Sequence, residues 1–511
     1  MNYKSGSAVI ALVCLVAGFR PAGVDASYKD DIGFTRLAAE LGPGVPTGTN
    51  ITVTQVESPI VVSTNYFVMP EPSEPAFAGK SFENRSGAPT NGSWHATEVG
   101  RNLYGANSIA SSINLISVYD ANHWLTNGYL HRYDTSFEPD VETNRIQNHS
   151  WVGDSSARID IIRRLDYAIV RDGFTAVVAL HNIGAFPQDL LAHSYNAIVV
   201  GKTSGEHNAG LTVFDEPGRI KPDIVAPLSG TSYSAGLISA AAALMMQTAD
   251  DNPSLTNATR PECIKALLMA GATKTEFPGW DRTTARPLDD VYGAGELNVY
   301  NSYYILTGGE QPADESNTVS LTGWHYGSAS GSVTSRYFFA VPPTNVMVRI
   351  SAMLTWNRNI YDLPSAGFNP LASLADLSLK FYSASNFVPI MLLDESTSAV
   401  DNVEHIYQQN LQPGQYALEV AGDSATNYCL AWFGQAGTTP GIASVGLTNG
   451  QFTCSVDLTT GYDYIVEATT NLLDTNGWSV LETNTPGVSP YYYVDTDSTN
   501  VPFRFYRFTV H

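Results

Sequence analysis

Two patterns of apolar and polar residues alternate through the first part of the chain. Residues 51–56 alternate β-branched with polar side chains, which predicts a strand that ends at Glu57. Residues 114–119 and 145–151 predict two further strands. Residues 159–171 place apolar side chains three or four positions apart, the pattern of a helix. Strands that alternate with helices predict a parallel sheet with crossover helices.

A strongly helical segment follows a Gly-Thr-Ser turn. Residues 235–247 are rich in Ala and Leu, which predicts a buried helix, and the turn at 230–232 stands directly before it. A serine before a helix is most often a cap. The positive field of the helix start also favours negative charge near the Ser232 hydroxyl, as a nucleophile requires. Residues 97–109 and 260–271 predict two more helices.

The second half of the chain changes to short alternating segments without helical periodicity. Such regular short strands predict a β-sandwich or jelly roll, separated from the first part by a linker at 307–312. We therefore expect an α/β domain at 27–306, a β-sandwich or jelly-roll domain at 313–436 and a small C-terminal β domain at 441–511.

Charge restricts the classes of partner. The chain has 27 Lys and Arg against 49 Asp and Glu, a formal net charge of −22. Nucleic acids and anionic membranes require a basic surface, so this balance argues against both as partners. No segment reaches the roughly 18 consecutive apolar residues that predict a membrane span.

The N-terminus has the pattern of a secretory signal peptide, residues 1–26. Lys4 supplies the positive end, residues 8–18 are a short apolar core, and residues 24–26 offer a small-residue cleavage site before Ser27. We expect the mature protein to be secreted or to lie at the exterior of the cell envelope.

Cysteine usage excludes a disulfide framework. Of four cysteines, signal cleavage would remove Cys14 and leave Cys263, Cys429 and Cys454. At most one disulfide can form among three, Cys429 with Cys454 being one pairing, and three buried free thiols are the alternative. No cysteine or histidine spacing predicts a metal site.

Several segments together resemble one enzyme family. The segment Lys-Pro-Asp-Ile-Val-Ala-Pro at 221–227, followed by Gly-Thr-Ser, resembles the nucleophile region of the subtilisin-like serine peptidases, the subtilases. The other matching segments are 48–58, similar to the strand that ends in the acid, 95–100, similar to the histidine helix, 177–184, similar to the strand and turn of the oxyanion asparagine, and 197–201, similar to the next strand. They occur in the order of the family.

The resemblance implies a secreted serine endopeptidase that hydrolyses peptide bonds of proteins or peptides. Ser232 would attack the scissile carbonyl, with His95 as the base and Glu57 as the acid that orients it. Asn182 would donate a hydrogen bond to the oxyanion, and this chemistry requires no cofactor.

Further residues receive a role from the same resemblance. Ser150, Trp151 and Val152 would form one wall of the S1 pocket, and His181 would stand beside it. The sandwich resembles the jelly-roll domain behind some bacterial subtilases. Its carboxylates Asp376, Asp401 and Glu404 are candidate calcium ligands because calcium prefers hard oxygen donors.

Departures from the family pattern leave an alternative open. Glu57 replaces an aspartate, Ala96 a glycine, and His181 a glycine, which would narrow the S1 pocket. The alternative is a catalytically inactive subtilase fold that acts as an extracellular binding or scaffold module. A sedolisin-like carboxyl peptidase does not fit, because that family requires a glutamate at His95 and an aspartate at Asn182.

Overall fold

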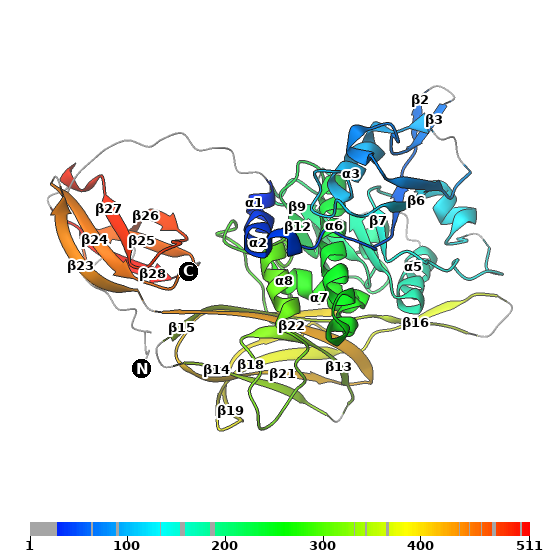
Figure 1. Cartoon of the computed structure of the whole chain (residues 1–511). Helices are drawn as coiled ribbons and strands as arrows, with labels where there is room; N and C mark the ends of the chain where they lie inside the picture. Colours follow the sequence, from blue (N-terminus) through cyan, green and yellow to red (C-terminus); the bar gives the residue numbers. More distant parts are fainter. Residues whose placement is uncertain are drawn as a thin grey trace.

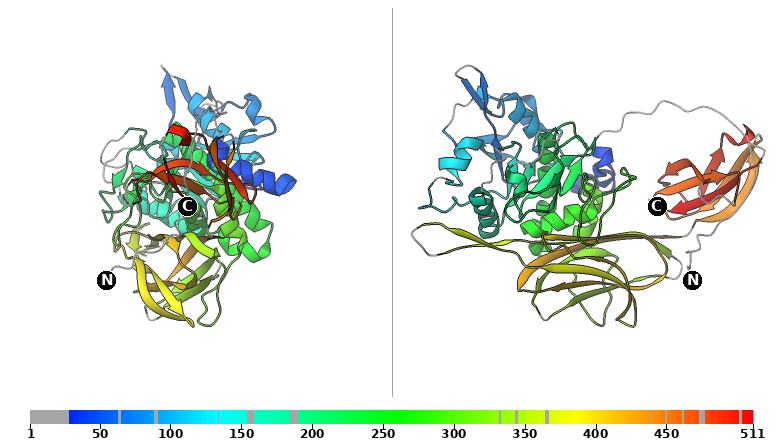
Figure 2. Two further views of the ribbon diagram at one scale, coloured as in Figure 1. Left: turned by 90° about the vertical axis from the view of Figure 1, so that its left-hand side faces the viewer. Right: turned by 180° about the vertical axis from the view of Figure 1, so that it is seen from behind.

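The computed structural model describes residues 28–62, 65–87, 91–132, 134–153, 159–183, 190–331, 333–342, 345–363, 367–438, 440–448, 450–460, 462–472, 477–500 and 503–510. The predicted signal peptide, 1–26, lies outside them. Figures 1 and 2 show an α/β region, a β-sandwich below it and a small β module at one end. This is the fold class that the sequence predicts, a parallel-sheet subtilisin-like domain followed by β-sandwich/jelly-roll and C-terminal β domains.

The α/β region is built on strands joined by helices. Its helices are α1 (Tyr28–Asp31), α2 (Phe34–Leu41), α3 (Trp94–Leu103), α4 (Ala121–His123), α5 (Ile159–Asp172), α6 (Thr231–Asp250), α7 (Pro261–Gly271) and α8 (Val299–Thr307). Its strands are β1 (Val53–Glu57), β2 (Ile60–Val62), β3 (Asn65–Met69), β4 (Ser81–Asn84), β5 (Asn91–Gly92), β6 (Leu115–Asp120), β7 (Ile146–His149), β8 (Thr175–Ala179), β9 (Ile198–Lys202), β10 (Gly210–Leu211), β11 (Ile220–Lys221) and β12 (Ile224–Ala226).

Seven of these strands form one parallel sheet in the order β12-β9-β8-β7-β1-β6-β4. Strand β1 lies inside the sheet, where it pairs with β6 and β7, and Glu57 at its end lies beside Asp120. Because the strands are parallel, their carboxyl ends meet at one edge, where open α/β sheets bind their ligands.

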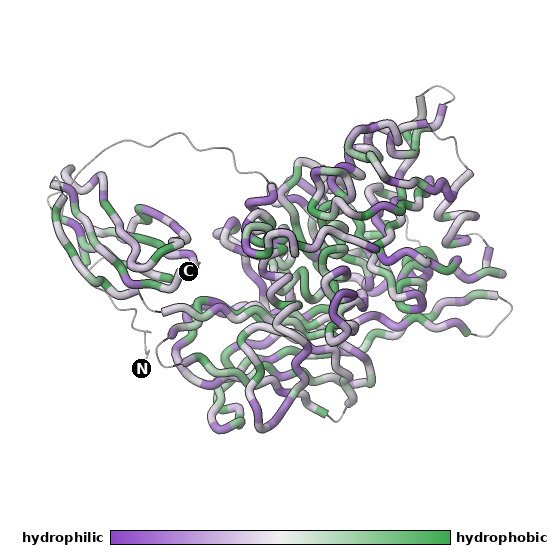
Figure 3. The backbone as a smooth tube through the Cα atoms, in the orientation of Figure 1, coloured by the Kyte–Doolittle hydropathy of each residue, from purple (hydrophilic) through white to green (hydrophobic). Residues whose placement is uncertain are grey.

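Hydrophobic cores cover both faces of this sheet. Helices α6, α7 and α8 pack in one core, and α5 packs in the other. Figure 3 shows hydrophobic positions among the helices and strands of this region. Small residues let α6 sit deep in its core: a Cβ on Gly236 would lie 3.1 Å from the carbonyl oxygen of Val99, so this glycine permits the close approach of α3.

Helix α3 begins and ends earlier than the predicted 97–109. It spans Trp94–Leu103 because the Ser93 hydroxyl accepts the Ala96 N–H and caps the first turn. The chain leaves the helix at Tyr104, whose N–H still bonds the Gly100 carbonyl. His95 therefore lies in the first turn of α3.

The β-sandwich consists of two four-stranded antiparallel sheets, β13-β22-β15-β20 and β14-β21-β18-β19. Its strands are β13 (Thr322–Ala329), β14 (Ser335–Val341), β15 (Asn345–Trp356), β18 (Leu377–Ser385), β19 (Val388–Ser396), β20 (Val403–Leu411), β21 (Gly414–Gly422) and β22 (Thr426–Thr438), with a hairpin of β16 (Asn359–Asp362) and β17 (Pro370–Ser373) that extends under α5. Numbered along the chain, the eight strands lie in the orders 1-8-3-6 and 2-7-4-5.

The sandwich and the α/β region share one hydrophobic core. Trp324, Met353 and Ala431 of the sandwich belong to the same buried cluster as α6 and α7. The indole N–H of Trp324 also donates to the Leu306 carbonyl at 3.0 Å. The segment at 307–312 therefore connects two domains that pack against each other, and it does not separate them in space.

A buried arginine extends this interface. Arg358, between β15 and β16, is fully buried and donates to the carboxylates of Asp166 at 2.8 Å and Asp215 at 2.7 Å. Both acids belong to the α/β region. Burial alone would raise the pKa of Asp215, but Arg163 and Arg358 outweigh it and hold that pKa below its ordinary value. The side chain of Asn196 bonds both the N–H and the carbonyl of Arg358.

The C-terminal module contains two three-stranded sheets, β23-β24-β27 and β26-β25-β28. Its strands are β23 (Gly441–Thr448), β24 (Gln451–Asp457), β25 (Tyr464–Thr469), β26 (Ser479–Asn484), β27 (Tyr491–Asp495) and β28 (Phe505–Val510). Cys263, Cys429 and Cys454 are free and buried, so the pairing of Cys429 with Cys454 is not formed. Among the helices of the described ranges, none is long and apolar enough to cross a membrane.

We expect Arg358→Met to lower the free energy of unfolding by about 3–5 kcal/mol, because it leaves two buried carboxylates short of a partner. Denaturant unfolding followed by circular dichroism measures this. The matched control is Arg336→Met, which removes a partly exposed pair with Glu419 and should cost about 0–1 kcal/mol. Equal losses in the two variants would contradict a stabilising role of the buried pair.

Candidate active site

Three strand ends and two helix starts meet at the carboxyl edge of the sheet. Around them lies a cavity of about 320 Å³. Seven of the eight residues that the sequence predicts for catalysis and substrate binding line it: His95, Ser150, Trp151, Val152, His181, Asn182 and Ser232. The eighth, Glu57, lies behind His95. The structure therefore brings all eight predicted residues together.

Glu57 and His95 form a buried hydrogen-bonded pair. Oε2 of Glu57 lies 2.7 Å from Nδ1 of His95, and the carboxylate side chain is 1% exposed. The imidazole is 23% exposed. Because Nδ1 faces the carboxylate, it carries the proton of the neutral ring, and Nε2 is the basic nitrogen left for the cavity.

Two opposing effects set the pKa of His95. Burial disfavours the imidazolium, but the hydrogen bond and the charge of Glu57 favour it more strongly. The pKa of His95 therefore lies above its ordinary value of 6.5. Glu57 thus strengthens His95 as a base for proton transfer.

Ser232 is the second residue of α6 and is 9% exposed. It exchanges two hydrogen bonds with Ser150: the Ser150 hydroxyl donates to the Ser232 carbonyl at 2.9 Å, and the Ser232 hydroxyl lies 3.4 Å from the Ser150 carbonyl. The first bond fixes the start of α6 to the end of β7. The second is long and weak, so the hydroxyl is free to turn toward another acceptor.

Asn182 fixes the start of α6 from the other side. Its Oδ1 accepts the Thr231 N–H at 2.9 Å, and the Thr231 hydroxyl donates to the Leu180 carbonyl. Because the oxygen of the amide is engaged by Thr231, its NH₂ group is the end left to donate to a ligand. Gly230, the N-cap of α6, offers no side-chain cap, so the N–H of Ser232 also has no partner within the helix ladder.

Aromatic and apolar side chains shape the rest of the cavity. Trp151 is nearly buried, and its indole N–H donates to His149 at 3.2 Å. Val152 is exposed on the same wall. His181 also lines the cavity, and its Nδ1 lies 3.0 Å from the Ile183 carbonyl oxygen and 3.2 Å from the Ile183 nitrogen. His181 therefore occupies space in the cavity that a glycine would leave empty.

Comparison with known proteins identifies this region. Residues 82–286 match the model of the Subtilase family. This part of the chain is a subtilase domain. It is thus a serine peptidase domain, and such domains act on proteins or peptides. His95, Asn182 and Ser232 lie within the matched range, whereas Glu57 lies before it.

Solved structures of proteases are also similar to the chain. The prenylagaramide maturation protease PagA is 18% identical, with 49% of this chain and 92% of that chain covered and a TM-score of 0.35. A protease from Pseudoalteromonas arctica is 14% identical, with 51% and 91% covered and a TM-score of 0.37. MycP1 from Mycobacterium smegmatis is 15% identical, with 57% and 88% covered and a TM-score of 0.34. No curated protein matches the chain.

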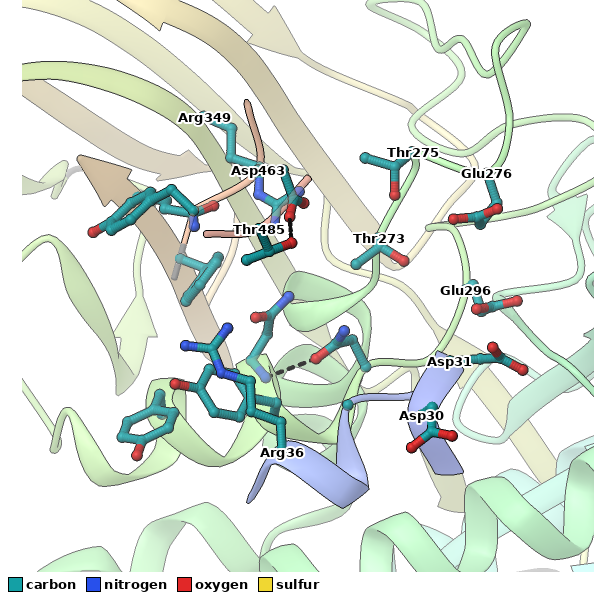
Figure 4. Close-up of a pocket in the computed structure, with 18 of the residues that line it drawn as sticks. Asp30, Asp31, Arg36, Thr273, Thr275, Glu276, Glu296, Arg349, Asp463 and Thr485 are labelled. Atoms are coloured by element: carbon teal, nitrogen blue, oxygen red, sulfur yellow. Dashed lines mark hydrogen bonds between the residues drawn. The ribbon is translucent and has the colours of Figure 1, made fainter. Parts of the chain in front are cut away.

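A larger cavity, of about 1220 Å³, lies away from the subtilase residues. Figure 4 shows the carboxylates of Asp30, Asp31, Glu276 and Glu296 along one side of it. Burial raises the pKa of Glu296 to about 7. None of the eight predicted site residues lines this cavity, so size alone does not locate the active site.

The predicted calcium ligands are not gathered into one site. The described residues contain no group of three or more His, Cys, Asp or Glu side chains that could hold a metal ion. Asp401 and Glu404 are instead buried and accept hydrogen bonds from the Ser398 hydroxyl and the Ser398 N–H. Calcium binding by the chain stays a prediction.

Two residues of the site were not found from the sequence. Gln55 donates to Oε1 of Glu57 at 2.7 Å, and Tyr104 donates to Gln55 at 2.5 Å. The available signal was that residues 55 and 57 share one face of β1 and are both polar. Alternation alone does not show whether such a face is buried, and here both side chains are buried.

We expect the ring of His95 to titrate above pH 6.5 in the parent chain and below it in Glu57→Gln. The amide retains the burial that lowers the pKa and lacks the charge that raises it. Carbon-13 shifts of labelled imidazoles measure both values. His149, whose pKa burial lowers to about 3, serves as an internal reference that stays neutral. An unchanged His95 pKa would contradict the pairing.

Proposed function

We propose that the protein is an active endopeptidase that hydrolyses peptide bonds through Ser232, His95 and Glu57. The observation that carries the proposal is the 2.7 Å hydrogen bond between Glu57 and His95, at a cavity that Ser232 and Asn182 also line. A serine hydroxyl is a poor nucleophile until a base takes its proton, and His95 supplies that base.

Acylation begins with the Ser232 hydroxyl. Its proton passes to Nε2 of His95 while Oγ forms a bond to the scissile carbonyl carbon. The carbonyl oxygen becomes an oxyanion, which accepts hydrogen bonds from the Asn182 NH₂ group and the Ser232 N–H. Glu57 holds the ring in the tautomer that leaves Nε2 basic, and its charge stabilises the imidazolium that forms.

The tetrahedral intermediate then collapses. The C–N bond breaks, and the imidazolium gives its proton to the departing amine. Water repeats the sequence on the acyl-enzyme: His95 takes its proton, the hydroxide adds to the ester carbon, and the Ser232 oxygen leaves with that proton. Every proton is thus accounted for by these side chains and water, and no cofactor enters the reaction.

The cavity also supports a role in substrate binding for the residues around it. We propose that Ser150, Trp151 and Val152 contact the residue before the scissile bond, and that His181 narrows its pocket. We further propose that the chain acts as a secreted protein or at the exterior of the cell envelope, as the pattern at 1–26 implies.

Ser232→Ala is expected to lose labelling by a fluorophosphonate probe and to lower hydrolysis of an unspecific peptide substrate by more than about 10³-fold. The probe reacts with an activated serine, so it tests the nucleophile without knowledge of the substrate. Ser234→Ala is the matched control, because it removes a buried hydroxyl from the same helical turn, one that donates to the Ala226 carbonyl. Unaltered labelling in Ser232→Ala would refute the assignment.

Glu57→Gln should lower kcat by about 10³–10⁴, because an amide neither stabilises the imidazolium nor fixes the useful tautomer. Glu57→Asp keeps the charge with a shorter side chain and should retain more activity than Glu57→Gln. Glu98→Gln, a change at a partly exposed glutamate on α3 that pairs with Arg101, is the control and should match the parent. A Glu57→Gln enzyme within about tenfold of the parent would remove Glu57 from the catalytic group.

A further inference from the structure

Behind Glu57 the structure contains a buried chain of hydrogen bonds. Gln55 donates from Nε2 to Oε1 of Glu57 at 2.7 Å and to the Ala96 carbonyl at 2.9 Å. The Tyr104 hydroxyl donates to Oε1 of Gln55 at 2.5 Å. Gln55 and Tyr104 are both fully buried and neither lines the substrate cavity.

The chemistry of the neighbours fixes the direction of this chain. Nε2 of Gln55 faces a carboxylate and a carbonyl, which only accept, so a flipped amide would place its oxygen against two other oxygens. Oε1 must therefore face Tyr104, and Tyr104 must be the donor. Burial and the charge of Glu57 raise the pKa of Tyr104, which keeps its hydroxyl protonated.

Gln55 contacts both partners of the acid and base pair. One N–H of its amide donates to the Glu57 oxygen that does not bond His95. The other donates to the carbonyl of Ala96, the residue directly after His95. Tyr104, the C-cap residue of α3, donates its hydroxyl to the oxygen of the same amide. Helix α3 is thus tied at both ends to the strand that carries Glu57.

The surroundings are shaped to place the Tyr104 hydroxyl. A Cβ on Gly100 would lie 2.4 Å from that hydroxyl, so the glycine leaves its space open. The ring packs against Phe77 and Phe82 at centroid distances of 5.3 Å and 5.9 Å. A glycine inside a helix costs stability, and here it makes room for this contact.

We propose that Gln55 is a positioning residue for the catalytic pair, and that Tyr104 holds Gln55 in place. The inference rests on the proposed function. A glutamate has one more rotatable bond than an aspartate, so its carboxylate needs a further anchor to stay aligned with the imidazole. The Gln55 amide supplies that anchor and also satisfies an oxygen that would otherwise be buried without a donor.

The test compares kcat and KM of the full chain with those of Gln55→Met, which keeps a similar volume and removes both donated bonds. We expect kcat to fall about 10- to 100-fold, the effect of losing a hydrogen bond to a charged group, with KM within twofold because substrate does not touch Gln55. Tyr104→Phe removes one hydroxyl, should lower kcat about 2- to 10-fold, and carries the test if Gln55→Met does not fold.

Thr54→Val is the matched control. Thr54 precedes Gln55 on β1, is buried and donates a hydrogen bond to Glu142, but its side chain lies on the opposite face of the strand. Its kcat and KM should equal those of the parent within about twofold. An equal loss of kcat in Thr54→Val and Gln55→Met would overturn the proposal, because removing any buried polar side chain from β1 would then lower kcat equally.

A double variant separates positioning from general damage. If Gln55 acts through Glu57, adding Gln55→Met to Glu57→Gln should lower kcat by no more than about twofold further. Additive losses would overturn the proposal. Ser232→Ala distinguishes failure of the proposed function from failure of the role of Gln55. If Ser232→Ala retains activity, the proposed function is refuted. If Ser232→Ala loses activity and Gln55→Met does not, only the role of Gln55 is refuted.

Discussion

A carboxylate buried at the end of an interior strand is the constraint on which the site depends. An unpaired charge in such a place costs several kcal/mol, so every oxygen of Glu57 requires a donor. His95 supplies one and Gln55 the other. To do so, α3 must begin beside the end of β1, and the cap at Ser93 starts the helix at that position. The need to satisfy one charge therefore fixes a strand and a helix relative to each other.

The start of α6 is held by a different set of bonds. Ser150 ties it to β7, while Asn182 and Thr231 tie it to the end of β8. These contacts place Ser232 on a helix whose other residues are almost all buried, so the hydroxyl sits on a rigid support. Functional groups on such elements keep their geometry better than groups on loops. The subtilase site thus depends on the packing of the sheet edge more than on its lining loops.

The parallel sheet followed from hydrophobic periodicity, and the helix after Ser232 followed from its Ala- and Leu-rich composition. The sequence displays both of these features directly. Periodicity failed where polar side chains are buried. Polarity alone does not indicate that Gln55 on β1 or Arg358 after β15 is buried, yet each is buried and bonded to partners distant in sequence. Likewise, the composition of 307–312 predicts a linker but carries no information on the packing across it. Pairings between distant residues are the part that one sequence does not display.

The shared core has a consequence for how the protein is made. Ribosomes release a chain from its N-terminus, and domains ordinarily fold as they emerge. Here Met353, Cys429 and Ala431, which complete the core around α6 and α7, are synthesised well after every strand of the parallel sheet. The nascent subtilase region thus keeps part of its apolar surface exposed until the sandwich strands arrive. Vectorial synthesis therefore leaves this region incomplete for as long as translation of the sandwich takes.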